Sequence, residues 1–218
     1  MRSTLARTNV LAGVLLVILC TMTLLSGVSQ QWFEWARAPE LYASQLQHDA
    51  TWLRAIIAVD DLFILAYVSA SLLLAERLQP RWTPQTLLLA GGALAAGVLD
   101  LHENHQLLAL LHQAEPGGEI SPEVIADRST WSQLKWLLGH LAFVSAGLAM
   151  RARSPLARVL QAALLGVQPV LGTLCWTVTA EPWPSLLVWS RYGAFVSGFL
   201  LFAWLYRDPE TENDAEFV

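Results

Sequence analysis

The chain has 218 residues, of which 55% are hydrophobic and only 14% are charged, and its formal net charge is −5. A water-soluble domain carries charge on about a quarter of its residues, so this composition excludes an ordinary soluble enzyme and indicates lipid as the main solvent. No basic patch is present, which argues against a nucleic-acid partner. Cys20 and Cys175 lie in apolar segments and are interpreted as buried thiols, not as a disulfide framework.

Six segments are long and apolar enough for membrane-spanning helices, which need about 20 mostly apolar residues. They cover residues 9–28, 52–75, 85–108, 131–150, 156–179 and 184–206. Short connections containing Pro, Gly or Arg separate them. We therefore predict an all-α fold, a polytopic membrane helix bundle of six transmembrane helices that forms a single domain over residues 1–206. Residues 207–218 form an acidic tail that is predicted to be disordered.

The arginines indicate the orientation of these spans, because basic residues are retained on the cytoplasmic side. They are concentrated before the first span, in the connections after the second and fourth spans, and after the sixth. Both termini are therefore predicted to be cytoplasmic, in a multi-pass protein of the bacterial inner membrane. The first span would also suit a cleaved signal peptide ending near Gly27-Val28-Ser29, and this alternative stays open.

The outward-facing segment 30–51 mixes aromatic and polar residues. Trp32, Phe33 and Trp35 stand close together, followed by Leu41 and Tyr42. Such a pattern is typical of a short helix lying in the membrane interface. We expect this segment to anchor the protein, with a lid over a site below it as the alternative.

Charged side chains inside the spans are the main functional signal, because each costs roughly 2.5–3.5 kcal/mol on insertion scales. At a helical rise of about 1.5 Å per residue, the charged side chains and the histidine that lie away from the ends of the spans are all within about 14 Å of the outer membrane boundary, on four different helices. They are Asp60, Asp61, Asp100, Glu103, Lys135, His140 and Arg191. We therefore predict a polar pocket in the outer half of the membrane.

Helical phase refines this pocket. Asp100, Glu103 and Asn104 follow i, i+3, i+4 spacing and share one helix face. Asp60 and Asp61 are consecutive and diverge by about 100°, so we expect only one of them to face the centre of the pocket.

Two chemistries suit these residues. The first is a divalent metal site built by the carboxylates together with one or more of three histidines, as in carboxylate-rich helix bundles. These histidines are His102, His105 and His140. The second is a metal-free network in which acids face Lys135 and Arg191, and one carboxyl serves as general acid, general base or proton relay. Structural ion pairing without chemistry is the third interpretation.

The one-sided pocket favours a membrane-embedded hydrolase or transferase that acts on a lipid or lipid-linked substrate, with membrane lipid as its partner. The predicted catalytic residues are Asp60, Asp61, Asp100, Glu103 and Lys135. The predicted substrate-binding residues are Asn104, Arg191 and Tyr192. A proton-coupled small transporter or channel and a non-catalytic subunit or sensor are the alternatives. The small-residue stretch 91–97 would allow close helix approach within one chain or in a homo-oligomer.

Overall fold

A computed structural model describes residues 2–78, 82–114, 117–178 and 183–207. All regular structure in these ranges is helical, which confirms the predicted all-α bundle. The predicted acidic tail lies almost entirely outside the described residues. The helices are α1 (Arg2–Ser26), the 3-10 helix η1 (Gln30–Glu34), α2 (Pro39–Leu78), α3 (Pro84–Ala114), α4 (Pro122–Ala149), α5 (Pro155–Ala162), the π-helical turn η2 (Ala163–Val167), α6 (Gln168–Thr177) and α7 (Trp183–Leu205).

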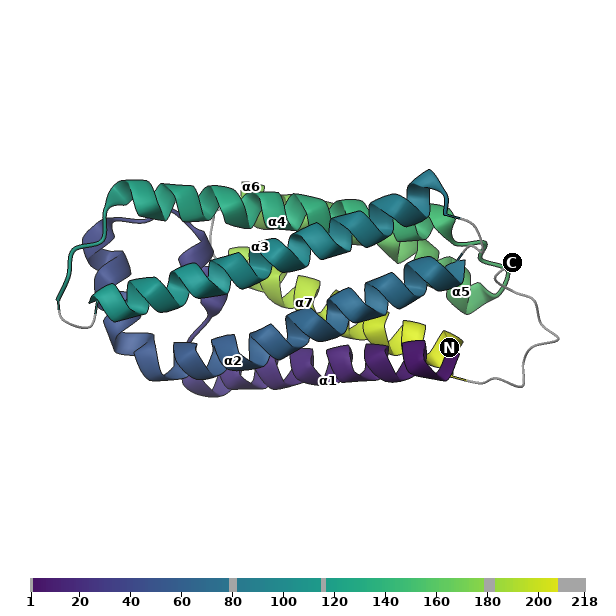
Figure 1. Ribbon diagram of the computed structural model, residues 1–218, viewed down its shortest axis with the longest axis horizontal. Helices are drawn as coiled ribbons and strands as arrows, with labels where there is room; N and C mark the ends of the chain where they lie inside the picture. The colour runs from purple at the N-terminus through teal and green to yellow at the C-terminus, as the bar shows by residue number, and fades with distance from the viewer. Residues whose placement is uncertain (1, 79–81, 115–116, 179–182, 208–218) are drawn as a thin grey trace.

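The long helices run side by side along one axis (Figure 1). α3 packs between α2 and α4, and α1 packs against α2 and α7. The start of α1 and the last turn of α7 lie at the same end of the bundle, which we name the terminal end. η1 lies at the opposite end, named the η1 end (Figure 1).

Five helical segments are long and apolar enough to cross a membrane, counting Pro155–Thr177 as one. The fourth predicted span lies almost wholly within α4 and is not among these five. It is less apolar than the others because it contains Gln133, Lys135 and His140. α4 nevertheless packs along α3 and completes the bundle. The protein is therefore a multi-pass membrane protein.

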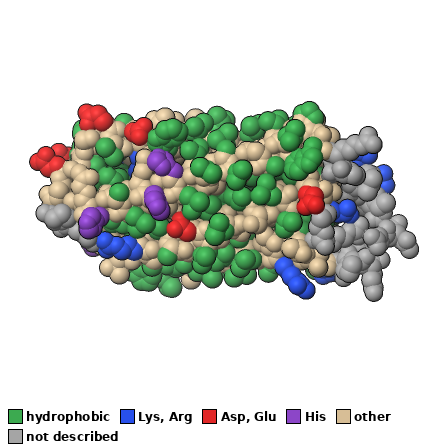
Figure 2. Space-filling model, in the orientation of Figure 1, with side chains coloured by type: hydrophobic (Ala, Val, Ile, Leu, Met, Phe, Trp, Pro, Cys, Tyr) green, Lys and Arg blue, Asp and Glu red, His purple; other side chains and the backbone are tan. Residues whose placement is uncertain are grey.

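The exterior of the bundle is apolar in the middle, and charged side chains gather toward its two ends (Figure 2). Large hydrophobic side chains that would be buried in a soluble protein are exposed here, including Leu25, Leu94, Leu137 and Trp204. Such a belt is what a bilayer requires of a helical protein.

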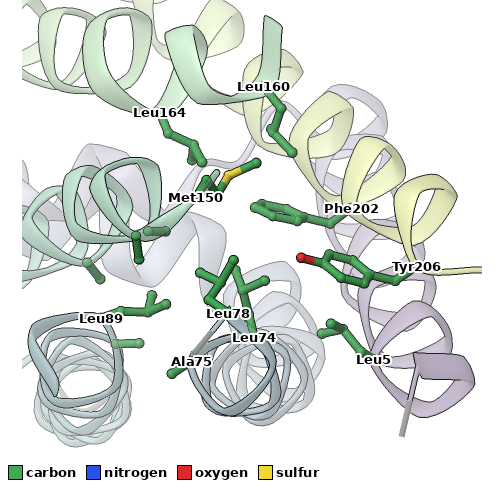
Figure 3. Close-up of a cluster of buried hydrophobic side chains, with 14 of the residues drawn as sticks. Leu5, Leu74, Ala75, Leu78, Leu89, Met150, Leu160, Leu164, Phe202 and Tyr206 are labelled. Carbon is green, nitrogen blue, oxygen red and sulfur yellow. The ribbon is translucent and has the colours of Figure 1, made fainter. Parts of the chain in front are cut away.

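Close-packed apolar side chains fill the bundle toward the terminal end (Figure 3). The buried residues there are Leu5 of α1, Leu74 and Leu78 of α2, Phe202 of α7, and Tyr206 directly after α7. We name this the sealing cluster. The polar residues described below lie closer to the η1 end, which contains a second buried apolar cluster.

The segment after α1 differs from its predicted form. Residues 30–51 do not make one interfacial helix, because η1 is separate and α2 already begins at Pro39. Phe33 and Glu34 are buried. The Phe33 ring meets the Tyr42 ring edge-on at 5.3 Å, and the Tyr42 hydroxyl donates to the Phe33 carbonyl over 3.1 Å. These contacts fold η1 into the bundle.

Small residues and a proline shape the helix contacts. A Cβ at Gly92 would meet the α4 backbone at 3.0 Å, and one at Gly97 would meet Val68 of α2 at 2.5 Å. The 91–97 stretch therefore brings helices of the same chain together. η2 precedes Pro169, whose ring would clash with the carbonyl four residues earlier in a regular helix, and the wider π-turn accommodates it.

Candidate functional site

Lys135 of α4 is the centre of a buried charge network. Its Nζ donates to Glu34 Oε1 at 2.9 Å, to Asp100 Oδ1 at 3.0 Å and to Glu103 Oε2 at 2.7 Å. An ammonium has three N–H donors, so these carboxylates occupy all of them. Burial raises the pKa of the Glu34 carboxyl, and the charge of Lys135 opposes that rise. Lys135 thus joins η1, α3 and α4.

Glu103 is held by a second cation, Arg128 of α4. The Arg128 NH2 group lies 3.0 Å from Glu103 Oε1, and its NH1 donates to the Glu103 carbonyl over 2.6 Å. The Arg128 Nε donates to the Phe33 carbonyl at 3.0 Å, and the Ser132 hydroxyl donates to Glu103 Oε1 at 2.8 Å. Both Glu103 oxygens therefore accept hydrogen bonds within the network.

Gln31 and Glu34 connect α7 to this network. Glu34 Oε2 accepts from Trp136 Nε1 at 3.0 Å and from Gln31 Nε2 at 3.1 Å. Gln31 Oε1 in turn accepts from Arg191 NH2 at 2.6 Å and from the Tyr192 hydroxyl at 3.0 Å. The fully buried Arg191 guanidinium also lies 3.5 Å above the Trp136 ring, a favourable cation–π geometry.

Asp60 and Asp61 of α2 are bound differently. Asn104 Nδ2 donates to Asp60 Oδ2 at 2.9 Å and to Asp61 Oδ1 at 2.8 Å, and its Oδ1 accepts from Gln30. Among the described residues, neither aspartate forms an ion pair with Lys or Arg. Asp60 lines a cavity whose walls do not include Asp61.

This cavity, named the polar cavity, has a volume of about 90 Å³. Its charged lining consists of Glu34, Asp60, Asp100 and Lys135. Asp100 Oδ2 also accepts from the Tyr67 hydroxyl at 2.8 Å, so both Asp100 oxygens are occupied. Asp60 is therefore the lining carboxylate that has no cationic partner among the described residues.

A larger cavity of about 390 Å³ adjoins the polar cavity at the η1 end, and we name it the vestibule. The two share Thr23, Ser29, Gln31 and Tyr192 in their walls. On the other side, an aromatic cavity of about 100 Å³ shares Asp100 and Lys135 with the polar cavity, along with three aromatic residues. Beyond it lies the sealing cluster.

The three predicted histidine ligands do not join the carboxylates. His102 and His105 are exposed, and the His102 ring lies edge-on to Trp131 at 6.0 Å. His140 packs against Gly172 of α6, and its Nδ1 lies 2.6 Å from the Trp136 carbonyl. Within the described ranges, no three His, Cys, Asp or Glu side chains are placed to hold a metal ion together. The geometry therefore favours the metal-free network.

The structure brings the other predicted site residues together. They come from α2, α3, α4 and α7 and are Asp60, Asp61, Asp100, Glu103, Asn104, Lys135, Arg191 and Tyr192. Their assigned catalytic and substrate-binding roles stay predictions. The contacts indicate that Lys135 and Glu103 support the site, since their polar atoms are occupied.

Sequence reasoning missed Glu34, Gln31 and Arg128. Arg128, Ser132 and Lys135 follow i, i+4, i+7 spacing, so extending the fourth span by one turn would have placed Arg128 on the same face as Lys135. No comparable periodic signal marks the short η1.

Comparison of the chain with protein-family models, curated proteins and solved structures finds no match. The function is therefore inferred from the geometry of the cluster and its cavities.

Proposed function

We propose that the protein is a membrane-embedded hydrolase or transferase that acts on a lipid or lipid-linked substrate, with Asp60 as general base. The observation that carries this proposal is the position of Asp60. Its carboxylate lines a cavity adjoining the vestibule and lacks a cationic partner among the described residues, whereas the other lining carboxylates are bound to Lys135.

The chemistry assigned to Asp60 is proton abstraction. A water molecule or substrate hydroxyl in the polar cavity would give its proton to the Asp60 carboxylate while its oxygen bonds to the ester carbon or phosphorus of the substrate. The bond from that atom to the leaving oxygen would then break, and the protonated Asp60 would return the proton to this oxygen. Asn104 fixes the carboxylate by donating to its Oδ2, which leaves Oδ1 for the proton transfer. The polar cavity is large enough for a few water molecules, each of which takes about 30 Å³ in the liquid.

The Lys135 network is assigned a positioning role. It fixes η1, α3 and α4 against one another, and these elements form part of the walls of the polar cavity. The charge of Lys135 also compensates the negative charge of Asp100 and Glu103 in this sheltered environment.

Access from one end supports an enzyme over a transporter. The polar cavity adjoins the vestibule at the η1 end, and the sealing cluster lies between it and the terminal end. A transport path would have to pass through closely packed Leu74, Leu78 and Phe202. From the arginine distribution we infer that the η1 end faces outward from a bacterial inner membrane, so the substrate would be reached from the outer leaflet.

The test is lipid turnover by the purified protein in detergent. The probes are short-chain phosphatidylethanolamine and phosphatidylglycerol, with products identified by mass spectrometry. Removing a general base typically costs about 10²–10⁴ in rate, so Asp60→Asn should lose at least about 100-fold. The exposed Asp127 serves as control, and Asp127→Asn should keep the wild-type rate. Unchanged turnover in Asp60→Asn, or no product from the wild type with either lipid, would contradict the proposal.

A further inference from the structure

We infer that the substrate headgroup is zwitterionic, with an ammonium group that enters the polar cavity beside Asp60 and a phosphate that remains near Arg37 in the vestibule. This inference rests on the proposed function and names its substrate class. Three features of the site carry it: the charge balance of the buried cluster, the aromatic walls of the vestibule, and the position of Arg37.

The buried cluster holds more acids than bases. Its carboxylates belong to Glu34, Asp60, Asp61, Asp100 and Glu103, and its cations to Arg128, Lys135 and Arg191. The surplus is two carboxylates, and Asp60 and Asp61 are the pair with no Lys or Arg partner in the described ranges. A positive group next to Asp60 would offset this charge, whereas an anion would be repelled in a sheltered, weakly screened site.

The route to Asp60 is lined by aromatic rings. Trp32, Trp35, Trp189 and Tyr192 all contribute to the walls of the vestibule. Aromatic faces attract ammonium groups through their quadrupole, most strongly for Trp and most strongly where water is displaced. The vestibule therefore suits the passage of a cation toward the carboxylates.

Arg37 supplies the opposite charge at a separate position. It lines the vestibule and not the polar cavity. Its guanidinium lies 3.4 Å over the Trp32 ring, and its Nε donates to the Trp32 carbonyl at 3.3 Å. No carboxylate pairs with it in the described part of the chain, so its terminal amino groups are suited to bind phosphate oxygens.

The order of these charges matches that of a zwitterionic lipid. Its phosphate is attached to the glycerol and its ammonium is at the free end of the headgroup. The ammonium can then reach the polar cavity while the phosphate stays in the vestibule, whose volume of about 390 Å³ is within the range of ligand pockets. The acyl chains would remain in the lipid phase.

The experiment is calorimetric binding to the purified protein in detergent. The probes are dihexanoyl phosphatidylethanolamine, dihexanoyl phosphatidylglycerol and free ethanolamine. We expect the ethanolamine lipid to bind at least about tenfold more tightly than the glycerol lipid, and free ethanolamine to bind more weakly than the lipid. Equal affinity for the two lipids, or tighter binding of the glycerol lipid, would overturn the inference. If free ethanolamine binds as tightly as the lipid, the claim that the ammonium group belongs to a lipid headgroup is overturned.

Two variants test whether Asp60 binds the ammonium and Arg37 binds the phosphate of the headgroup. Asp60→Asn should abolish the preference between the lipids, and Arg37→Gln should weaken both lipids by a similar factor while keeping the preference. Glu40→Gln, at an exposed position in the first turn of α2, is the control and should bind as the wild type does. If Asp60→Asn still prefers the ethanolamine lipid over the glycerol lipid, the inference is overturned. If Asp60→Asn does not fold, Arg37→Gln still tests the position of the phosphate.

Turnover separates this inference from the proposed function. Hydrolysis or transfer on the glycerol lipid without selective binding of the ethanolamine lipid would overturn the zwitterionic substrate and leave the enzyme proposal standing. Selective binding of the ethanolamine lipid without turnover of either lipid would support the site and contradict the enzyme.

Discussion

Lys135 is surrounded by three carboxylates and has no donor left for a ligand. Its burial would be costly alone, and the carboxylates would repel one another without it. Asp60 differs because an amide, not a cation, holds it. At the residue scale, the ion-paired side chains around Lys135 therefore hold the helices together, and the Asp60 carboxylate is the one available for chemistry.

Lys135→Met is predicted to destabilise the folded protein. Removing one partner of a buried ion pair costs about 3–5 kcal/mol, because the remaining charge is left uncompensated. Here Glu34, Asp100 and Glu103 would all lose that partner. The free energy of unfolding, measured by denaturation in mixed micelles, should fall by this amount. Arg7→Met, at an exposed position, should change it by less than about 0.5 kcal/mol.

A double-mutant cycle makes this prediction specific to the ion pair. Lys135→Met combined with Glu103→Gln should be less destabilising than the sum of the two single variants, because the second change removes one uncompensated charge. Strict additivity of the two changes would show that Lys135 and Glu103 do not interact in the folded protein.

At the scale of elements, the sequence predicted the helices better than it predicted what joins them. Apolar length identified five of the six predicted spans, and the depth of the charges along the helices predicted a shared pocket. η1 was assigned to the interface because its aromatic and polar residues resemble an anchor, yet it is folded into the bundle by Phe33 and Glu34. A segment of five residues has no periodicity from which burial could be inferred.

The packing of α6 on α4 gives a prediction at this scale. A Cβ at Gly172 would lie 2.0 Å from His140 Nε2, so Gly172→Ala must displace the imidazole. Overpacking of this kind costs about 1–3 kcal/mol, which unfolding in mixed micelles would reveal. Gly193→Ala in α7 is the matched control, since no atom lies within 4 Å of its added Cβ. Equal stability of both variants would show that α6 does not pack on His140.

At the scale of the whole molecule, the bundle is polar toward one end and sealed toward the other. The vestibule adjoins the polar cavity at the η1 end, and the sealing cluster fills the terminal end. This asymmetry was predicted from the depth of the charges along their helices. The sequence did not predict which carboxylates support the structure and which one is available for chemistry. That distinction depends on which atoms meet across α2, α3, α4 and η1.

Side-specific labelling of Cys20 tests this one-ended access most directly. Cys20 lines the polar cavity, and Cys175→Ser leaves it as the single thiol of the chain. The reagent is a membrane-impermeant, positively charged methanethiosulfonate, applied to intact cells and to inverted membrane vesicles, with Cys20→Ser as the blank. We predict modification in intact cells only, slowed by dihexanoyl phosphatidylethanolamine. Modification in inverted vesicles, or in neither preparation, would contradict a polar cavity that opens at the η1 end alone.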